Sequence, residues 1–298
     1  MIGLLTTYCC HLLLHAYRQV SSDKPLSYAE LIDQVFRKAT NPTLRRLATP
    51  ARYLVDAALI ATQIGYCSVY ILFCSRMLKE IVDSYYPDES DRLDIKVYET
   101  ILVAVLIPYC FVKTLSVLSF FSTLANLVTA ACLIVVMQYV FRNLKPLDAV
   151  PWAPTSWSTL PLFFGTAMFT FESIALILPI ENRMKDRQRF HGWNGLLSTA
   201  MAVIIVLYII VGFFGYLAFG SDAKMVLSNM PHGEWPYQAV KLLYVCCIIV
   251  SFNLQLYVPV QILFPPLKKG IPGQWFANYG EYIFRATLVL FTCKSQKL

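Results

Sequence analysis

Charged residues are scarce in this sequence. They make up 14% of its 298 residues, against roughly a quarter in soluble domains, whereas hydrophobic residues make up 57%. A water-soluble chain of this length has no single core large enough to hide so much apolar surface. Composition therefore predicts an all-α membrane protein. The net charge of +7 needs no nucleic-acid partner, because basic residues in cytoplasmic loops and their attraction to an anionic leaflet account for it.

Several motifs are also absent. There is no P-loop glycine pattern, which excludes an ATP-driven pump within this chain. No nucleophile–base pair, C-x-x-C spacing or metal cluster emerges, so we expect neither an enzyme nor a cofactor. All nine cysteines lie in apolar runs, which argues against a disulfide framework. His11 and His15 are four residues apart and share a helix face. Their possible roles are a proton relay, a metal-binding pair or ordinary hydrogen bonds to the backbone and water.

Apolar runs of about 20 residues, the length that spans a bilayer, recur along the chain. Six are complete: 54–75, 99–118, 118–141, 159–180, 194–219 and 237–264. Two are partial, 1–17 and 282–293. The first has no basic leader and no small-residue cleavage site, so it predicts part of a transmembrane helix rather than a signal peptide.

Loop charge predicts the orientation, because Lys and Arg stay on the cytoplasmic side. The basic loops 18–52, 181–193 and 265–280, and a tight turn at Lys113, are expected in the cytoplasm. Each of the five tryptophans precedes an apolar run, at the depth of the lipid headgroups. The chain is therefore expected to be one multi-pass transmembrane domain over 1–298.

The first cytoplasmic loop, 18–52, contains the pattern of a short amphipathic helix. Ser27 and Glu30 have capping-box spacing, and Leu31, Val35 and Phe36 would line one face. The helix is expected to end near Asn41–Pro42 and to serve as a connector on the membrane surface.

Glu172 is the one acidic residue predicted at the centre of an apolar run. An ionised carboxylate there costs roughly 2.5–3.5 kcal/mol, so it must face protein or water, find a donor or hold a proton. Gly165, Thr166 and Thr170 weaken a helix beside it, and Pro179 limits the cytoplasmic end. Transporters use such interrupted helices to present backbone groups to substrates. The alternative is a structural carboxylate that caps broken helix ends.

Five segments carry a family resemblance. PLFFGTAMFTFESIALILPIENRMKD (161–186) resembles the sixth helix of proton-coupled amino acid transporters, in the amino acid/auxin permease branch. The others resemble part of the second helix (8–16), the third (62–73), the entry to the fifth (115–126) and the eighth (240–262). The resemblance implies the inverted-repeat (APC/LeuT-like) transporter fold and symport of small neutral amino acids with protons.

Measured against this family, the chain is expected to be incomplete at both ends. Residues 1–17 correspond to a partial second helix, 54–264 to helices three to eight, and 282–293 to the start of the ninth. Members commonly carry glycines just after the glutamate, where this chain has Ser173 and Ala175. The resemblance implies substrate binding by Gly165, Thr166, Phe169, Thr170, Phe171, Glu172, Tyr70, Ser251 and Gln255, with Glu172 also the candidate for proton coupling.

The expected partners are a small amino acid, protons and the lipid bilayer, in the plasma membrane or a lysosomal or endosomal membrane. Two alternatives to transport stay open. One is a truncated regulatory or amino-acid-sensing relative that associates with full-length members. The other is a seven-helix receptor, which the number of runs disfavours.

Overall fold

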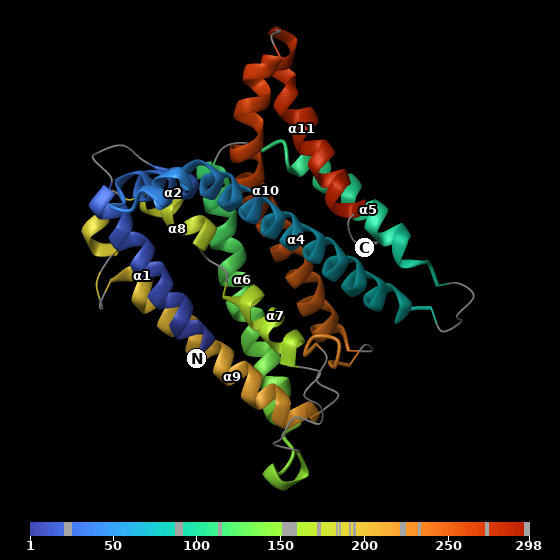
Figure 1. The fold of residues 1–298 in the computed structure, drawn as a ribbon. Coiled ribbons are helices and arrows are strands. Elements are labelled where there is room, and N and C mark those ends of the chain that lie inside the picture. The colour runs from blue at the N-terminus through green and yellow to red at the C-terminus, as the bar shows by residue number, and fades with distance from the viewer. Residues whose placement is uncertain are drawn as a thin grey trace. The chain divides into compact units, whose positions relative to one another are not determined.

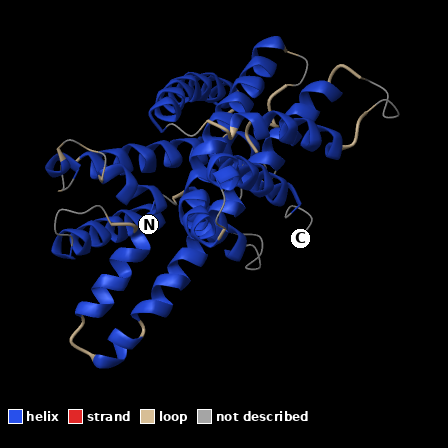
Figure 2. Ribbon diagram, turned by 90° about the horizontal axis from the view of Figure 1, so that it is seen from above, coloured by secondary structure: helices blue, strands red, loops and turns tan. Residues whose placement is uncertain are grey.

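The structure is a computed structural model, and it describes most of the chain. The described residues are 1–20, 26–86, 92–112, 115–150, 160–171, 174–182, 184, 186–190, 192, 195–220, 225–231, 234–271 and 274–294. Within these ranges every regular element is a helix and no β-strand occurs (Figures 1 and 2). The expected all-α class is confirmed for the described part.

Four helices in the described part are long and apolar enough to cross a membrane. They are α4 (Ala48–Asp83), α6 (Leu115–Arg142), α9 (Leu196–Phe219) and α10 (Trp235–Gly270). α4, α6 and α10 each contain one of the predicted apolar runs, and α9 covers the run at 194–219 except for its first two residues. α4 begins at Ala48, before its run starts, because the basic segment ahead of the run is itself helical.

Two predicted runs are divided in the structure. The run at 99–118 is not one helix, because α5 (Ile95–Tyr109) ends just after Pro108 and α6 begins at Leu115. Proline lacks the N–H that would continue the helix through its own position. The expected tight turn at Lys113 lies outside the described residues.

The run at 159–180 forms two helices, α7 (Leu160–Thr170) and α8 (Ile174–Glu181), with Phe171 in a turn after the first. Glu172 and Ser173 lie outside the described residues. At the carboxyl end, α11 (Gln274–Lys294) is longer than the partial run predicted at 282–293.

The chain divides into two compact units. Unit 1 comprises Met1–Ala58 and Lys145–Gly220, and unit 2 comprises Leu59–Leu144 and Ser221–Leu298. The core of unit 1 is built from α1 (Ile2–Val20), α2 (Tyr28–Lys38), α8, the short 3-10 helix η4 (Arg187–Phe190) and α9. Its buried side chains are Cys10, Leu13, Leu14, Tyr17, Leu31, Ile177, Leu178, Phe190, Leu197 and Met201.

The predicted amphipathic helix is confirmed as α2. Ser27 Oγ accepts the Glu30 N–H at 3.3 Å, and the Glu30 carboxylate accepts the Ser27 N–H at 2.9 Å, so both halves of the capping box form. Leu31 is buried against α1 and α8. A second short helix, α3 (Pro42–Arg46), follows, with Asn41 as its N-cap and Pro42 at its first position.

Unit 2 is organised around α10. This helix packs along α6, and it also contacts α11, which in turn packs against α5. In Figure 1 α10 and α11 form a helical hairpin. All nine cysteines of the chain are free thiols, most of them buried.

Candidate functional site

Tyr70 on α4 and Gln255 on α10 are brought together inside unit 2. The Gln255 amide nitrogen donates to the Tyr70 hydroxyl at 3.5 Å. The amide oxygen of Gln255 is buried and accepts no hydrogen bond from any described residue. A buried acceptor without a donor costs about 1–3 kcal/mol, so this oxygen is suited to a ligand that brings an N–H group.

The backbone of α10 adds a second acceptor at the same place. Pro259 lies inside α10 and has no N–H, so the Gln255 carbonyl lacks the helical hydrogen bond that position 259 normally supplies. Ser251, one turn earlier, donates its hydroxyl to the Cys247 carbonyl at 3.0 Å, which leaves its oxygen available as an acceptor. This part of α10 therefore offers acceptors, which match an ammonium group.

Gln63 lies two turns before Tyr70 on α4, and residues seven apart share a helix face. Only 2% of the residue is exposed, and its amide oxygen also accepts no hydrogen bond within the described part of the chain. Unit 2 thus holds two buried amide oxygens that are unsatisfied.

The candidate residues of α7 lie in unit 1. Thr166 and Thr170 donate their hydroxyls to the carbonyls one turn back, Leu162 at 2.9 Å and Thr166 at 2.8 Å. Such bonds satisfy the threonine hydroxyls, but they slightly destabilise a helix and often bend it. Around Gly165, a Cβ atom would meet no other atom within 4 Å. Phe169 is exposed on the same helix.

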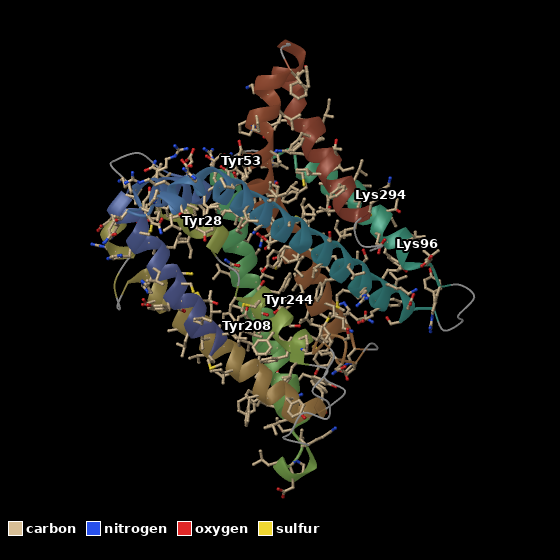
Figure 3. All side chains as sticks on the ribbon, viewed as in Figure 1. Tyr28, Tyr53, Lys96, Tyr208, Tyr244 and Lys294 are labelled. Atoms are coloured by element: carbon tan, nitrogen blue, oxygen red, sulfur yellow. The ribbon has the colours of Figure 1, made fainter. Side chains whose placement is uncertain are left out.

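Phe171 ends α7 in a tightly packed place. Its ring makes an edge-to-face contact with Tyr208 of α9, with centroids 5.2 Å apart. The Tyr208 hydroxyl lies 3.5 Å from the Thr170 carbonyl, to which it donates (Figure 3 labels Tyr208). On α1, a Cβ at Gly3 would come within 2.8 Å of the Phe171 ring and of Ile205. α1, α7 and α9 therefore meet at Phe171, immediately before Glu172.

Glu172 lies outside the described residues, so its role remains a prediction. The charges that sequence analysis missed are in unit 2. Lys241 of α10 has a side chain only 1% exposed, and its ammonium pairs with the Glu80 carboxylate of α4 at 3.3 Å. Ser228 donates its hydroxyl to the other Glu80 oxygen at 2.7 Å. The sequence does contain a signal for this pair, because Lys241 is a single charged residue inside the apolar run at 237–264.

A second buried cation lies on α11. Arg285 pairs with Glu281 at 2.9 Å and donates to the Cys110 carbonyl at 3.1 Å. It also donates to the Asn253 side-chain oxygen at 3.4 Å. The amide nitrogen of Asn253 donates to the carbonyls of Tyr109 and Val112 at the end of α5. Asn253 is therefore occupied in holding α5, α10 and α11 together, which agrees with the preference for Ser251 and Gln255 as binding residues.

His11 of α1 contacts Ser198 of α9 through its Nε2 at 2.8 Å. In turn, the Ser198 hydroxyl lies 2.9 Å from the Gly192 carbonyl, to which it donates. Across the described part of the chain, no group of three or more His, Cys, Asp or Glu side chains gathers as a metal site. The observed contact of His11 is thus a helix-to-helix hydrogen bond.

Comparison with known proteins gives a match over nearly the whole chain. The family model described as "Transmembrane amino acid transporter protein" matches residues 1–293. The proton-coupled amino acid transporter-like protein pathetic of Drosophila melanogaster is 29% identical over 289 residues, which cover 96% of this chain and 60% of that protein. Vacuolar amino acid transporter 3 of Saccharomyces cerevisiae is 29% identical over 254 residues, 81% of this chain and 35% of that protein.

Proposed function

Because the chain belongs to the transmembrane amino acid transporter family, we propose that it carries small neutral amino acids across a membrane in symport with protons. This membership confirms the resemblance seen in residues 161–186, and the family consists of transporters rather than enzymes. The chain spans about three fifths and one third of the two relatives' lengths. Activity and substrate are therefore proposals for this chain.

The observation that carries the proposal is the match over residues 1–293, together with the acceptor-rich place on α10. The unsatisfied Gln255 amide oxygen, the Gln255 carbonyl freed by Pro259 and the Ser251 oxygen are acceptors for a substrate ammonium. Tyr70, held at 3.5 Å from Gln255, supplies a hydroxyl for the same substrate. Such acceptors match the ammonium group of an amino acid, and the small neutral side chain is proposed from the family resemblance.

For unit 1 we propose that Glu172 is the proton-linked group, in the segment between α7 and α8. Gly165, Thr166, Phe169, Thr170 and Phe171 are proposed to line the interrupted stretch before it. The name of the Drosophila relative, which includes "proton-coupled", supports the coupling. We also propose the inverted-repeat (APC/LeuT-like) fold, and residence in the plasma membrane or, as the vacuolar relative suggests, a lysosomal or endosomal membrane.

The test is uptake by proteoliposomes that contain the purified chain. We expect uptake of a small neutral amino acid to rise with an inward proton gradient, and Glu172→Gln to abolish that rise while protein content stays unchanged. Glu234→Gln is the matched control, because Glu234 is exposed and makes no side-chain cap bond at the start of α10. Uptake that is absent from the unmodified chain would overturn the proposal, and uptake that is equal with and without Glu172 would overturn the coupling role.

A further inference from the structure

The segment 37–54 of unit 1, from the end of α2 through α3 to the first turns of α4, is unusually basic. It contains five basic residues and no acidic one: Arg37, Lys38, Arg45, Arg46 and Arg52. We call it the basic segment. Figure 3 labels Tyr53 within it.

Two of the five cations are already engaged in the structure. Arg37 pairs with Asp33 at 2.8 Å, and Lys38 donates to the Val20 carbonyl at 3.4 Å. The other three, Arg45, Arg46 and Arg52, are exposed, and none forms an ion pair with a carboxylate of the described residues. Three exposed guanidinium groups on one short segment attract a multivalent anion, although the Asp56 carboxylate, one turn along α4, offsets part of the charge of Arg52.

The geometry of the basic segment is held in place rather than loose. The Asn41 side chain caps α3 by accepting the Thr43 N–H at 3.0 Å, and Pro42 fixes its first turn. The Arg45 Nε donates to the Ala39 carbonyl at 2.8 Å, and the residue is exposed. α2, which packs against α3, is itself fixed by its capping box. An anion would thus find its donors already arranged.

Large apolar side chains alternate with these arginines. Leu44 and Leu47 on α3 are 40% and 47% exposed, and Tyr53 and Leu54 on α4 are 69% and 71% exposed. A soluble phosphate offers nothing to cover this apolar surface. A phospholipid offers both parts, since its headgroup meets the arginines and its acyl chains meet the leucines.

We propose that the basic segment binds the phosphorylated headgroup of an anionic phospholipid in the leaflet on that side of the membrane, which loop charge predicts to be the cytoplasmic one. Arg45, Arg46 and Arg52 contact the phosphates, and Leu44, Leu47 and Leu54 insert among the upper acyl chains. The site is independent of substrate binding by Gln255 and of proton coupling by Glu172.

The test is binding of short-chain phosphatidylinositol 4,5-bisphosphate to the purified full chain, measured by native mass spectrometry and by a fluorescent lipid analogue. Arg46→Gln/Arg52→Gln is the informative variant. Neither arginine side chain makes a hydrogen bond in the described structure, so we expect the double substitution to leave the fold intact. Each basic residue near an anionic surface contributes about fivefold to binding, so we expect about 30-fold weaker binding by this variant.

Lys96→Gln/Lys294→Gln is the matched control. It also removes two exposed positive charges, but from unit 2 (both residues are labelled in Figure 3), and we expect binding within about twofold of the unmodified chain. Equal losses in the two variants, or no loss in Arg46→Gln/Arg52→Gln, would overturn the proposal.

A second comparison separates a lipid from a free phosphate compound. Soluble inositol 1,4,5-trisphosphate carries the same phosphates without acyl chains, and we expect it to bind at least tenfold more weakly than the lipid. Leu44→Ser/Leu47→Ser is expected to weaken the lipid several-fold and to leave the soluble headgroup unaffected. Equally tight binding of the soluble headgroup, or an unaltered lipid affinity in the leucine variant, would rule out a lipid site.

Discussion

At the scale of single residues, polar groups buried in unit 2 divide into satisfied and unsatisfied ones. Asn253 and Arg285 use their hydrogen-bonding groups on neighbouring helices. The amide oxygens of Gln63 and Gln255 remain without a donor among the described residues. Asn253 and Arg285 therefore serve to hold helices together, whereas the free amide oxygens of Gln63 and Gln255 are suited to bind a ligand.

Gln255→Leu is the direct test of that difference. Removal of the amide deletes an acceptor for the substrate ammonium, and hydrogen bonds to charged groups contribute about 1.5–3 kcal/mol, so we expect KM for uptake to rise tenfold or more. Gln138→Leu, at an exposed position on α6, serves as the control and should leave KM unchanged. Initial uptake rates over a range of substrate concentrations measure both. If KM were the same in both variants, Gln255 would not be a substrate ligand.

The sequence predicted some of these positions and missed others. The family resemblance placed Tyr70, Ser251 and Gln255 among the candidates. Lys241 and Arg285 were missed although each is a charge within an apolar run. Glu80, which neutralises Lys241, lies on another helix, so only the fold identifies that pair, whereas Glu281, which neutralises Arg285, lies one turn earlier on α11 itself.

At the scale of helices, α4 and α10 are joined by a charge pair with unequal members. Lys241 is buried, whereas the Glu80 side chain is 29% exposed and also accepts from Ser228. Loss of the exposed member therefore removes the carboxylate that faces a buried cation, and loss of the buried member leaves a carboxylate that water and Ser228 still solvate. The two single substitutions should consequently differ in cost.

We expect Glu80→Gln to lower the free energy of unfolding by roughly 2–3 kcal/mol, at or below the range for a fully buried pair because Glu80 is partly exposed. Lys241→Met should cost less, and the double variant should recover most of the loss. Thermal unfolding in detergent, followed by tryptophan fluorescence, ranks the stabilities of the three variants. An equal cost for both single variants, with no recovery in the double, would mean that the pair does not hold the helices.

Helix ends were predicted well only where local chemistry sets them. The capping box at Ser27 and Glu30 fixed the start of α2, and Asn41–Pro42 separates it from α3. Hydropathy alone did not locate the end of α5, because 99–118 is apolar through a position where Pro108 stops the helix. Apolar runs locate membrane segments, but hydropathy alone does not locate the helix ends within them.

At the scale of the whole chain, the distribution of basic residues predicts which side each loop faces. The basic segment 37–54 is expected in the cytoplasm, and the start of α5, with Asp94 as its N-cap, on the opposite side. Cysteines introduced at these two loops therefore ought to react with opposite compartments.

We expect Arg46→Cys to be labelled by an impermeant maleimide only after the plasma membrane is permeabilised, and Asp94→Cys to be labelled in intact cells when the chain is at the cell surface. Both positions are exposed, and the unmodified chain gives the background signal of the natural cysteines, of which Cys9 and Cys246 are exposed. Gel-shift quantification of labelled chain decides the outcome. Labelling of both cysteines from the same side would contradict the orientation.

The close approach of α1 to Phe171 bears on which mutations the gene can tolerate. A methyl group at position 3 would collide with the Phe171 ring and with Ile205, whereas the same addition at Gly165 meets open space. A saturation library should therefore accept many residues at codon 165 and very few at codon 3. Natural variants at codon 3 would be expected to impair the proposed transport even when the polypeptide still reaches its membrane, because the displaced ring adjoins the proposed proton-linked acid.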